Sequence, residues 1–424
     1  MPLSRTKVDS LPHAVFLQRV SHTSSAISLE ARLGQGAFLA LRLVDLLAPA
    51  RAAVSADAFH YQWVATDRFC RELRAAAAEG AHIHGVAAAA VDAHRLSDVR
   101  LVAPALFAYA HFLEDGLRLD EALDVLATLV DVGEGRVTAA DAVALRLRIA
   151  RVHRKLNRFD DAEAAYAQAG ALAAAHGDRR SELLSRIGRA TALLHRGNLA
   201  ESEQSLRGIL ADARAAGELD AEARAEHDIG ATLWYRGQPD QAVPHFWRAF
   251  ELYEDEDSRL RALGDVGSAL LTLGNTSGAE QALAEVVRRG GTHEATTNAM
   301  IELMHCASYR QDRVGFARWR ERAEARLGDM PPNIRADFYL KQGIGQARFG
   351  QFKRAEALLD QALIEANTAG LHELEFRIER IQRGLGPCAD QLQRELAAAT
   401  EPACDSAELR EVSASLAQLV GSKG

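Results

Sequence analysis

A few close pairs and runs of residues in the chain could bind a metal ion or a cofactor. His82 and His84 are two positions apart, and on a helix their side chains would point about 200° away from each other. The acidic run 254–257 lacks the glycine and the distal glutamate of a calcium-binding loop. Gly343 and Gly345 do not follow a predicted strand, as a dinucleotide-binding loop requires. None of these motifs predicts a metal or a cofactor.

Motifs for covalent and metal-assisted catalysis are also missing from the sequence. There is no GxSxG, no GxxxxGK[ST] and no HExxH. The four cysteines (Cys70, Cys306, Cys388 and Cys404) are far apart and show no CxxC spacing. We therefore expect free thiols in a reducing compartment. The sequence predicts no catalytic residues and a protein that is not an enzyme.

Composition narrows the class of protein further. The 424 residues are 48% hydrophobic and 25% charged, which is typical of folded rather than disordered chains. The net charge of −8 gives no general attraction to nucleic acid or anionic lipid, so we expect neither as a partner. The sequence shows no secretory signal and no apolar run long enough to span a membrane. We expect a cytoplasmic protein, and the sequence leaves its oligomeric state open.

Short segments with a small residue at the same position recur along the chain. The clear copies and the two weaker ones are anchored at Ala122, Ala162, Ser202, Ala242, Ala279, Phe316 and Ala355. Successive anchors are 40, 40, 40, 37, 37 and 39 residues apart. Periods of this length indicate a repeat protein in which each unit packs on its neighbours.

Each repeat contains the signals of two helices joined by a tight turn. The turn position of the five clear copies is occupied by Asn157, Gly197, Gly237, Gly274 and Gly350. Glycine and asparagine are the residues that most readily end a helix in a left-handed conformation. Four residues beyond the anchor stands a bulky side chain, as in Tyr166, Phe246 and Leu359. We expect these side chains to fill the interface between closely crossing helices.

This arrangement of small residue, turn glycine, alanine and bulky residue resembles the tetratricopeptide repeat over about residues 103–375. The copies are longer than the usual repeat of about 34 residues, and they resemble the bacterial regulatory repeats of Rap-type peptide sensors and MalT-like regulators. The resemblance implies an all-α fold, a right-handed α-solenoid of helix-turn-helix repeats. We expect a helical region at 1–102 that can include a degenerate repeat, seven repeats at 103–384, and capping helices at 385–424.

The resemblance also implies where a partner binds. In tetratricopeptide arrays the first helix of each repeat lines a concave groove, with side chains at spacings of three and four on one helical face. The residues at these positions are His111, Arg148, Arg151, Arg154, Lys155, His195, Arg224, His227, Trp234, Tyr235, Arg261, Asn298, His305, Tyr309 and Lys341. Arginine binds carboxylates and aromatic rings give contact area, so this set suits an acidic or amphipathic segment. A solvated helix face with no binding role shows the same spacing.

The function implied by the resemblance is a protein-interaction scaffold or regulator that binds a peptide or helix of a partner protein. A signalling-peptide sensor of the Rap-like type is the first alternative, favoured by the non-repeat region at 1–102. A regulatory subunit of a transcriptional regulator is the second alternative. The sequence shows no convincing helix-turn-helix for direct DNA binding.

Overall fold

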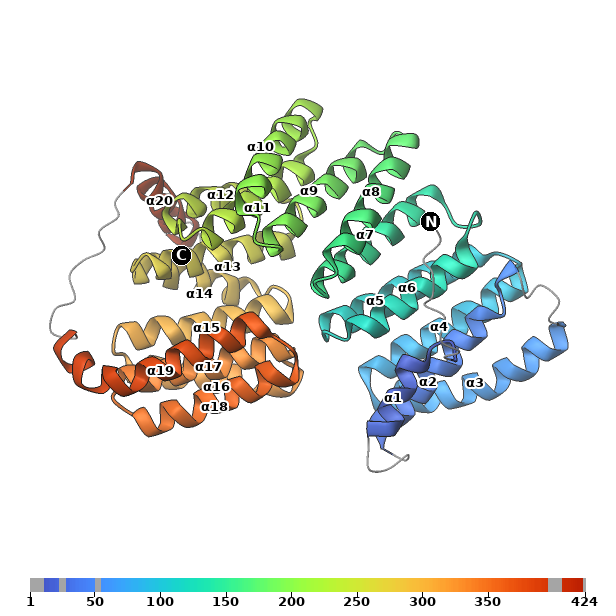
Figure 1. The fold of residues 1–424 in the computed structure, drawn as a ribbon, viewed down its shortest axis with the longest axis horizontal. Helices are drawn as coiled ribbons and strands as arrows, with labels where there is room; N and C mark the ends of the chain where they lie inside the picture. The colour runs from blue at the N-terminus through green and yellow to red at the C-terminus, as the bar shows by residue number, and fades with distance from the viewer. Residues whose placement is uncertain (1–10, 23–27, 50–54, 396–405, 422–424) are drawn as a thin grey trace. The chain divides into compact units, whose positions relative to one another are not determined.

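The computed structural model describes residues 11–22, 28–49, 55–395 and 406–421, and within these ranges the chain is helical without β-strands. It forms two units, residues 1–192 and 193–424, each described here by itself. Figure 1 shows that both consist of helices joined in tandem by short turns. The prediction of an all-α fold built from helix-turn-helix repeats is confirmed.

The first unit begins with four helices that precede the repeats. Their bounds are α1 (Ala14–His22), α2 (Leu29–Asp45), α3 (Ala56–Ala76) and α4 (Ala78–Leu96), followed by the short 3-10 helix η2 (Val99–Val102). The serines before α2 and α3 cap them, because the Ser28 and Ser55 hydroxyls accept hydrogen bonds from the amides of Ala31 and Ala58.

The repeats follow as paired helices. The first unit contains α5 (Ala103–Asp115), α6 (Leu119–Gly133), α7 (Ala139–Lys155) and α8 (Phe159–Ala175), and the boundary between units falls within α9 (Arg179–His195). The second unit continues with α10 (Leu199–Ala216), α11 (Leu219–Tyr235), α12 (Pro239–Leu252), α13 (Glu256–Thr272), α14 (Thr276–Arg289), α15 (His293–Tyr309), α16 (Arg313–Glu324), η3 (Leu327–Asp329), α17 (Pro332–Arg348), α18 (Phe352–Thr368), α19 (His372–Glu395) and α20 (Ala407–Gly421).

The turns between paired helices have the predicted left-handed backbone. Asn157 and the glycines at 197, 237, 274 and 350 all have positive φ, between 57° and 88°. The two weaker copies adopt the same conformation without glycine, at Leu117 (φ 57°) and Gln311 (φ 58°). The turn geometry therefore recurs in every repeat, including those whose sequence signal is faint.

Small residues let the helices cross closely, as predicted. A Cβ atom on Gly230 would lie 2.7 Å from Phe246 Cδ1, and one on Gly343 would lie 3.0 Å from Leu359 Cγ. Both contacts join the two helices of one repeat. Tyr166 differs, because its ring packs on a glycine of α9, in the following repeat.

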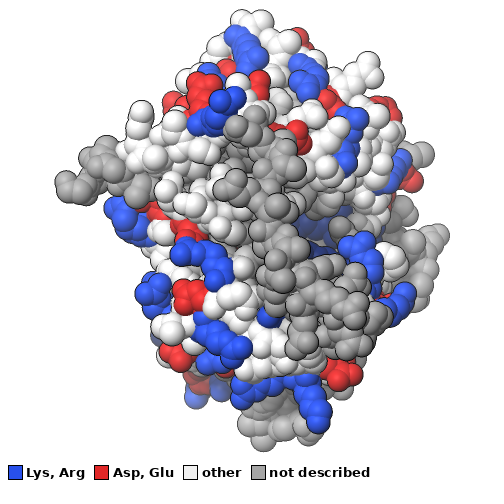
Figure 2. Space-filling view, turned by 90° about the vertical axis from the view of Figure 1, so that its left-hand side faces the viewer, with Lys and Arg blue, Asp and Glu red and all other residues white. Residues whose placement is uncertain are grey.

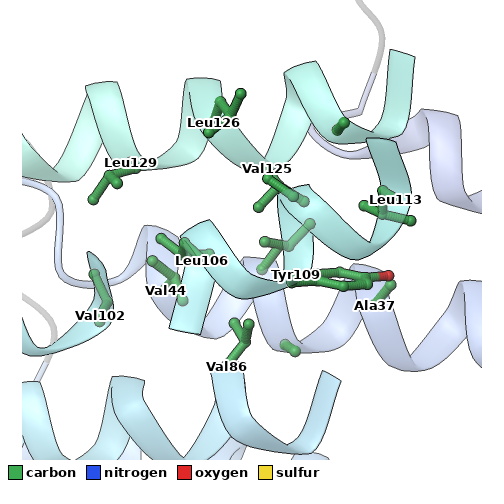
Figure 3. Packing of buried hydrophobic residues seen from close by; sticks show 14 of the residues in the cluster. Ala37, Val44, Val86, Val102, Leu106, Tyr109, Leu113, Val125, Leu126 and Leu129 are labelled. Atoms are coloured by element: carbon green, nitrogen blue, oxygen red, sulfur yellow. The ribbon is translucent and has the colours of Figure 1, made fainter. Parts of the chain in front are cut away.

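The helices before the repeats share a core with the first repeat. Figure 3 shows Leu106 and Tyr109 of α5 between Val125 of α6 on one side and Val86 of α4 on the other, with Val44 of α2 alongside. All five side chains are buried. The N-terminal helices and the first repeat therefore contribute to one core.

Buried ion pairs also attach α1 to this core. Arg19 binds Glu79 of α4 and Glu121 of α6, at 3.0 and 2.6 Å, and the Tyr109 hydroxyl donates to Glu79. His13, just before α1, lies 3.2 Å from Asp45 of α2 and 2.5 Å from Asp124 of α6. The contacts of Arg19 and His13 thus join α1 and the residue just before it to helices far away in the sequence.

Two helices lie in the C-terminal part of the chain. Gly384 does not interrupt the first, α19, which extends to Glu395 and packs against α17 and α18 at the end of the array. The second helix, α20, packs instead against α12 and α14. It therefore lies against the repeats two and three before the last one. Residues 396–405 lie outside the described residues.

Candidate partner-binding surface

In the first unit, neighbouring first helices contact each other through side chains about one repeat apart. Arg151 and Lys155 of α7 bind Glu114 of α5, at 2.6 and 2.8 Å. Arg148 lies over the ring of Phe107, 4.9 Å from its centroid. These contacts place Phe107, Glu114, Arg148, Arg151 and Lys155 on one side of α5 and α7. We call this side of the first helices the first-helix face.

The first-helix face of α7 carries more positive than negative charge. Burial raises the pKa of Glu114, but Arg151 and Lys155 outweigh it and keep the pKa below its ordinary value. Burial and the neighbouring Arg151 lower the pKa of Arg148. The Nε atoms of Arg151 and Arg154 are buried and have no hydrogen-bond partner among the described residues. In these contacts Arg151 and Lys155 share one carboxylate, and Arg148 lies close to Arg151.

In the second unit, His227 of α11 contacts the next first helix. Its Nε2 atom lies 2.7 Å from Asp265 Oδ2 on α13, and its Nδ1 atom lies 3.1 Å from the Tyr253 hydroxyl. His227 itself is buried. Both ring nitrogens of His227 therefore already have hydrogen-bond partners within the protein.

Lys341 of α17 lies in a cluster of polar side chains from three first helices. Its Nζ atom donates to Glu302 Oε1 at 2.6 Å and to Asp337 Oδ2 at 2.5 Å. Glu302 in turn accepts from Ser268 Oγ of α13 at 3.4 Å. Burial alone would lower the pKa of Lys341, but the two carboxylates raise it above its ordinary value. Lys341 is therefore charged, buried and neutralised by its own neighbours.

Arg348 lies on the same face and holds two aromatic residues of α15. Its guanidinium lies 3.5 Å from the ring centroid of Tyr309, and it donates to Ser308 Oγ at 2.8 Å and to His305 Nδ1 at 3.4 Å. Burial, followed by the charge of Arg348, holds the pKa of His305 well below its ordinary value. His305 is thus neutral at physiological pH. Tyr309 remains 47% exposed above this cluster.

A second group of predicted residues gathers at the end of α11. Tyr235 is 52% exposed, and its ring centroid lies 6.5 Å from that of His195, which is also exposed. Trp234 is half-buried and packs against Phe246 at 6.1 Å between ring centroids. Together these rings give the second unit an aromatic surface beside its polar clusters.

The remaining predicted residues make local contacts. His111 is exposed and lies 3.3 Å from Asp115 on the same helix. Arg224 pairs with the adjacent turn of α11 through Asp220, at 3.1 Å. Arg261 is exposed and donates to the hydroxyl of Ser258, whereas Asn298 is half-buried.

The structure corrects the expectation that all these positions are exposed. His227, His305 and Lys341 are each less than 10% exposed. Two of the carboxylates that make this possible, Asp265 and Glu302, were not singled out by the sequence patterns. Asp265 follows His227 by 38 residues, and Glu302 precedes Lys341 by 39 residues. A basic and an acidic residue separated by about one repeat is the sequence signal that could have identified these pairs.

Other reactive groups are few in the part of the chain that the structure describes. No group of three or more histidine, cysteine or acidic side chains there is arranged to hold a metal ion. Cys70 and Cys306 are free and buried, and burial raises the pKa of both thiols to about 12. The side chains of Cys388 and Cys404 lie outside the described residues. No helix in these ranges has both the length and the apolar character needed to cross a membrane.

Comparison with known proteins gives one family match. Residues 179–255, which include α9, α10, α11 and α12, match the family model of the tetratricopeptide repeat. No curated protein matches the chain in sequence.

Several solved structures are similar to the chain at low sequence identity. A Rap protein complexed with competence and sporulation factor is 12% identical, with 85% of this chain and 99% of that chain covered and a TM-score of 0.42. NprR in complex with its cognate peptide NprX is 13% identical (82% and 90% covered, TM-score 0.46). Aspartyl phosphate phosphatase F from Bacillus subtilis is also 13% identical (81% and 95% covered, TM-score 0.46). The family match over residues 179–255 and the recurring helix pairs with left-handed turns support a tetratricopeptide-repeat fold for the chain.

Proposed function

We propose that the chain is an interaction scaffold or regulator that binds a peptide or helix of a partner protein through its first-helix faces. The partner segment carries acidic side chains together with apolar ones. The observation that carries this proposal is the charge on α7, where Arg151 and Lys155 share the carboxylate of Glu114 and Arg148 lies over the ring of Phe107. A bound carboxylate would complete the hydrogen bonding of the guanidinium groups there.

The buried guanidinium atoms sharpen the argument for a carboxylate at this place. A buried donor without a partner costs about 1–3 kcal/mol, and the Nε atoms of both Arg151 and Arg154 are in that position among the described residues. Arg148 is held against Phe107 rather than against a carboxylate. A surface arginine that only aids solubility would keep its polar atoms in water, so this arrangement favours a binding role over the solvated-face alternative.

Exposed aromatic rings of the second unit favour apolar side chains in the proposed partner segment. Lys341 and His227 of this unit already have carboxylate partners, whereas Tyr235 and Tyr309 are about half exposed. Arg348 holds the ring of Tyr309 in place. A ring that is fixed before binding loses little conformational entropy when a partner packs on it.

A displayed library of random 16-residue peptides, selected on the purified full chain, would test this proposal. We expect the recovered peptides to be rich in Asp and Glu beside apolar residues. The double variant Arg148→Gln/Arg154→Gln removes the two cations that do not bind Glu114. It should weaken binding of a recovered peptide by about tenfold, measured by fluorescence anisotropy.

The matched control is Arg158→Gln/Arg189→Gln, which removes the same charge from two exposed ion pairs, with Asp120 and Glu163. It should leave binding within a factor of two, and raising the salt concentration should weaken binding to the unaltered chain. Recovery of basic or uncharged peptides, or equal losses in both double variants, would contradict the proposal.

The sensor alternative is favoured by one further observation. Arg19 and His13 connect the N-terminal helices to α6 through buried ion pairs, so these helices are fixed to the first repeat. A peptide that altered the first repeat would therefore also displace the N-terminal helices. Small-angle scattering with a recovered peptide tests this alternative: compaction on binding supports a sensor, and unchanged dimensions support a static scaffold.

A further inference from the structure

The C-terminal helix α20 (Ala407–Gly421) occupies a surface away from the first-helix face. It packs against α12 and α14, which are the second helices of two successive repeats (Figure 1). Its neighbour in sequence, α19, packs against α17 and α18. The contact of α20 is therefore not the continuation of the array, in which each helix packs on its nearest neighbours.

One face of α20 makes this contact. Leu409, Val412 and Leu416 are 7%, 4% and 0% exposed, and their spacing of three and then four residues places them on one side of the helix. Glu408 and Glu411 on the other side are exposed. The helix also starts independently, because the Ser406 hydroxyl accepts a hydrogen bond from the Leu409 amide.

The receiving helix α12 has two apolar stripes. One stripe, which includes Phe246, packs on α11 within the repeat. The second stripe consists of Val243, Trp247 and Phe250, with spacings of four and three. The Phe250 ring centroid lies 5.0 Å from Arg259 of α13 and 5.9 Å from Arg289 of α14, so the Phe250 end of this stripe is directed toward α13 and α14. A helix that contacts both α12 and α14 approaches this same side.

We propose that the outer face of α12 and α14 is a binding surface for an amphipathic helix of a partner protein, and that α20 occupies it as an internal competitor. The partner helix carries branched apolar residues at positions i, i+3 and i+7, as α20 does. This surface is separate from the first-helix face and does not depend on the function proposed above.

The number of buried residues on α20 supports an exchangeable rather than a permanent contact. Three described side chains of α20 are less than 10% exposed, whereas a repeat helix such as α13 buries nine of its residues. Figure 2 shows, on the side of α19 and α20, Lys and Arg interspersed with Asp and Glu over the described surface. Recognition there rests on the apolar stripe rather than on a field of one sign, which argues against an acidic peptide as the occupant.

A labelled peptide with the sequence of residues 406–421 tests the proposal on the full chain. The triple variant Leu409→Glu/Val412→Glu/Leu416→Glu should release α20 and leave the surface open. We expect the peptide to bind the triple variant at least about tenfold more tightly than the unaltered chain, because a tethered competitor has an effective concentration of about millimolar. A peptide with serine at these three positions should not bind either protein.

A second measurement covers the case in which the triple variant fails to fold. Excess peptide, marked in mass by Arg410→Lys, should accelerate amide hydrogen exchange in α20 of the unaltered chain and leave α19 unchanged. The proposal is overturned if the folded triple variant does not bind the peptide, or if exchange in α20 is unaffected at saturating peptide. It is also overturned if the unaltered chain forms dimers in which α20 is exchanged between two copies.

Discussion

Lys341 Nζ lies 2.6 Å from Glu302 Oε1, although the two residues are 39 positions apart. The separation is one repeat, so the lysine of one first helix reaches the carboxylate of the preceding first helix. The same relationship joins Arg151 to Glu114, 37 positions apart, and His227 to Asp265, 38 positions apart. Ion pairs in register with the repeat thus connect neighbouring first helices within each unit.

The first prediction concerns the contribution of this pair to stability. Lys341→Met leaves Glu302 and Asp337 partly buried beside each other without their cation, which we expect to destabilise the chain by about 3 kcal/mol. Urea denaturation followed by circular dichroism would measure the change. The control is Arg383→Met, which removes an exposed pair with Glu379 and should cost less than about 0.5 kcal/mol. Similar losses of stability in both variants would show that the buried ion pairs of Lys341 stabilise the chain no more than an exposed pair does.

The second prediction concerns close crossing of helices at glycine. A Cβ atom on Gly230 would lie 2.7 Å from Phe246 Cδ1, whereas one on Gly264 would meet no atom within 4 Å. Gly230→Ala should therefore destabilise the chain by about 1–3 kcal/mol. Gly264→Ala, in the middle of α13, should stabilise it by about 0.5–1 kcal/mol. Thermal unfolding of the two variants should give shifts of opposite sign; a stabilising Gly230→Ala would mean that Phe246 moves freely.

The third prediction concerns one of the two turns that have neither glycine nor asparagine at the left-handed position. Gln311 is exposed and has a φ of 58°, a backbone conformation that costs a residue with a side chain about 1–2 kcal/mol. Gln311→Gly should relieve this cost and raise the midpoint of thermal unfolding. Gly237→Ala, at the equivalent turn with a φ of 76°, should lower it. If Gln311→Gly lowers the midpoint, the cost of greater flexibility in the unfolded chain outweighs the strain.

The fourth prediction concerns pH. Burial alone would lower the pKa of His13, but its hydrogen bonds to Asp124 and Asp45 and their charges raise it from 6.5 to about 9. Protonated His13 therefore stabilises the folded state fully below pH 6.5, and this stabilisation, about 3 kcal/mol, is lost as the pH rises to about 9.

Urea denaturation at pH 6, 7.5 and 9 would measure this dependence, with His13→Gln as the comparison. The variant should be less stable than the unaltered chain at pH 6, and the difference should shrink toward pH 9. A difference that is constant over this range would show that the charge of His13 does not stabilise the attachment of α1.

Local structure was largely predictable from the sequence. The residue type at each turn decides whether a left-handed backbone is favourable. Gly197 and Asn157 therefore indicate the end of a helix, whatever the rest of the chain contains. The anchor spacing likewise predicts the helix pairs, because a small residue opposite a bulky one is what a close crossing requires. These signals depend on neighbours within a single repeat.

Only the tertiary structure decided which surfaces meet. The sequence placed His227 and Lys341 on first helices, but it did not show that Asp265 and Glu302 are their partners. It also predicted capping helices at 385–424 without indicating that α20 packs on α12 and α14. A helix forms from interactions a few residues apart, whereas its docking depends on an apolar stripe finding a complementary surface anywhere along the chain. The repeat could therefore be predicted from the local spacing of residues. The exposure of the predicted binding residues depends instead on contacts one repeat or more away in the sequence.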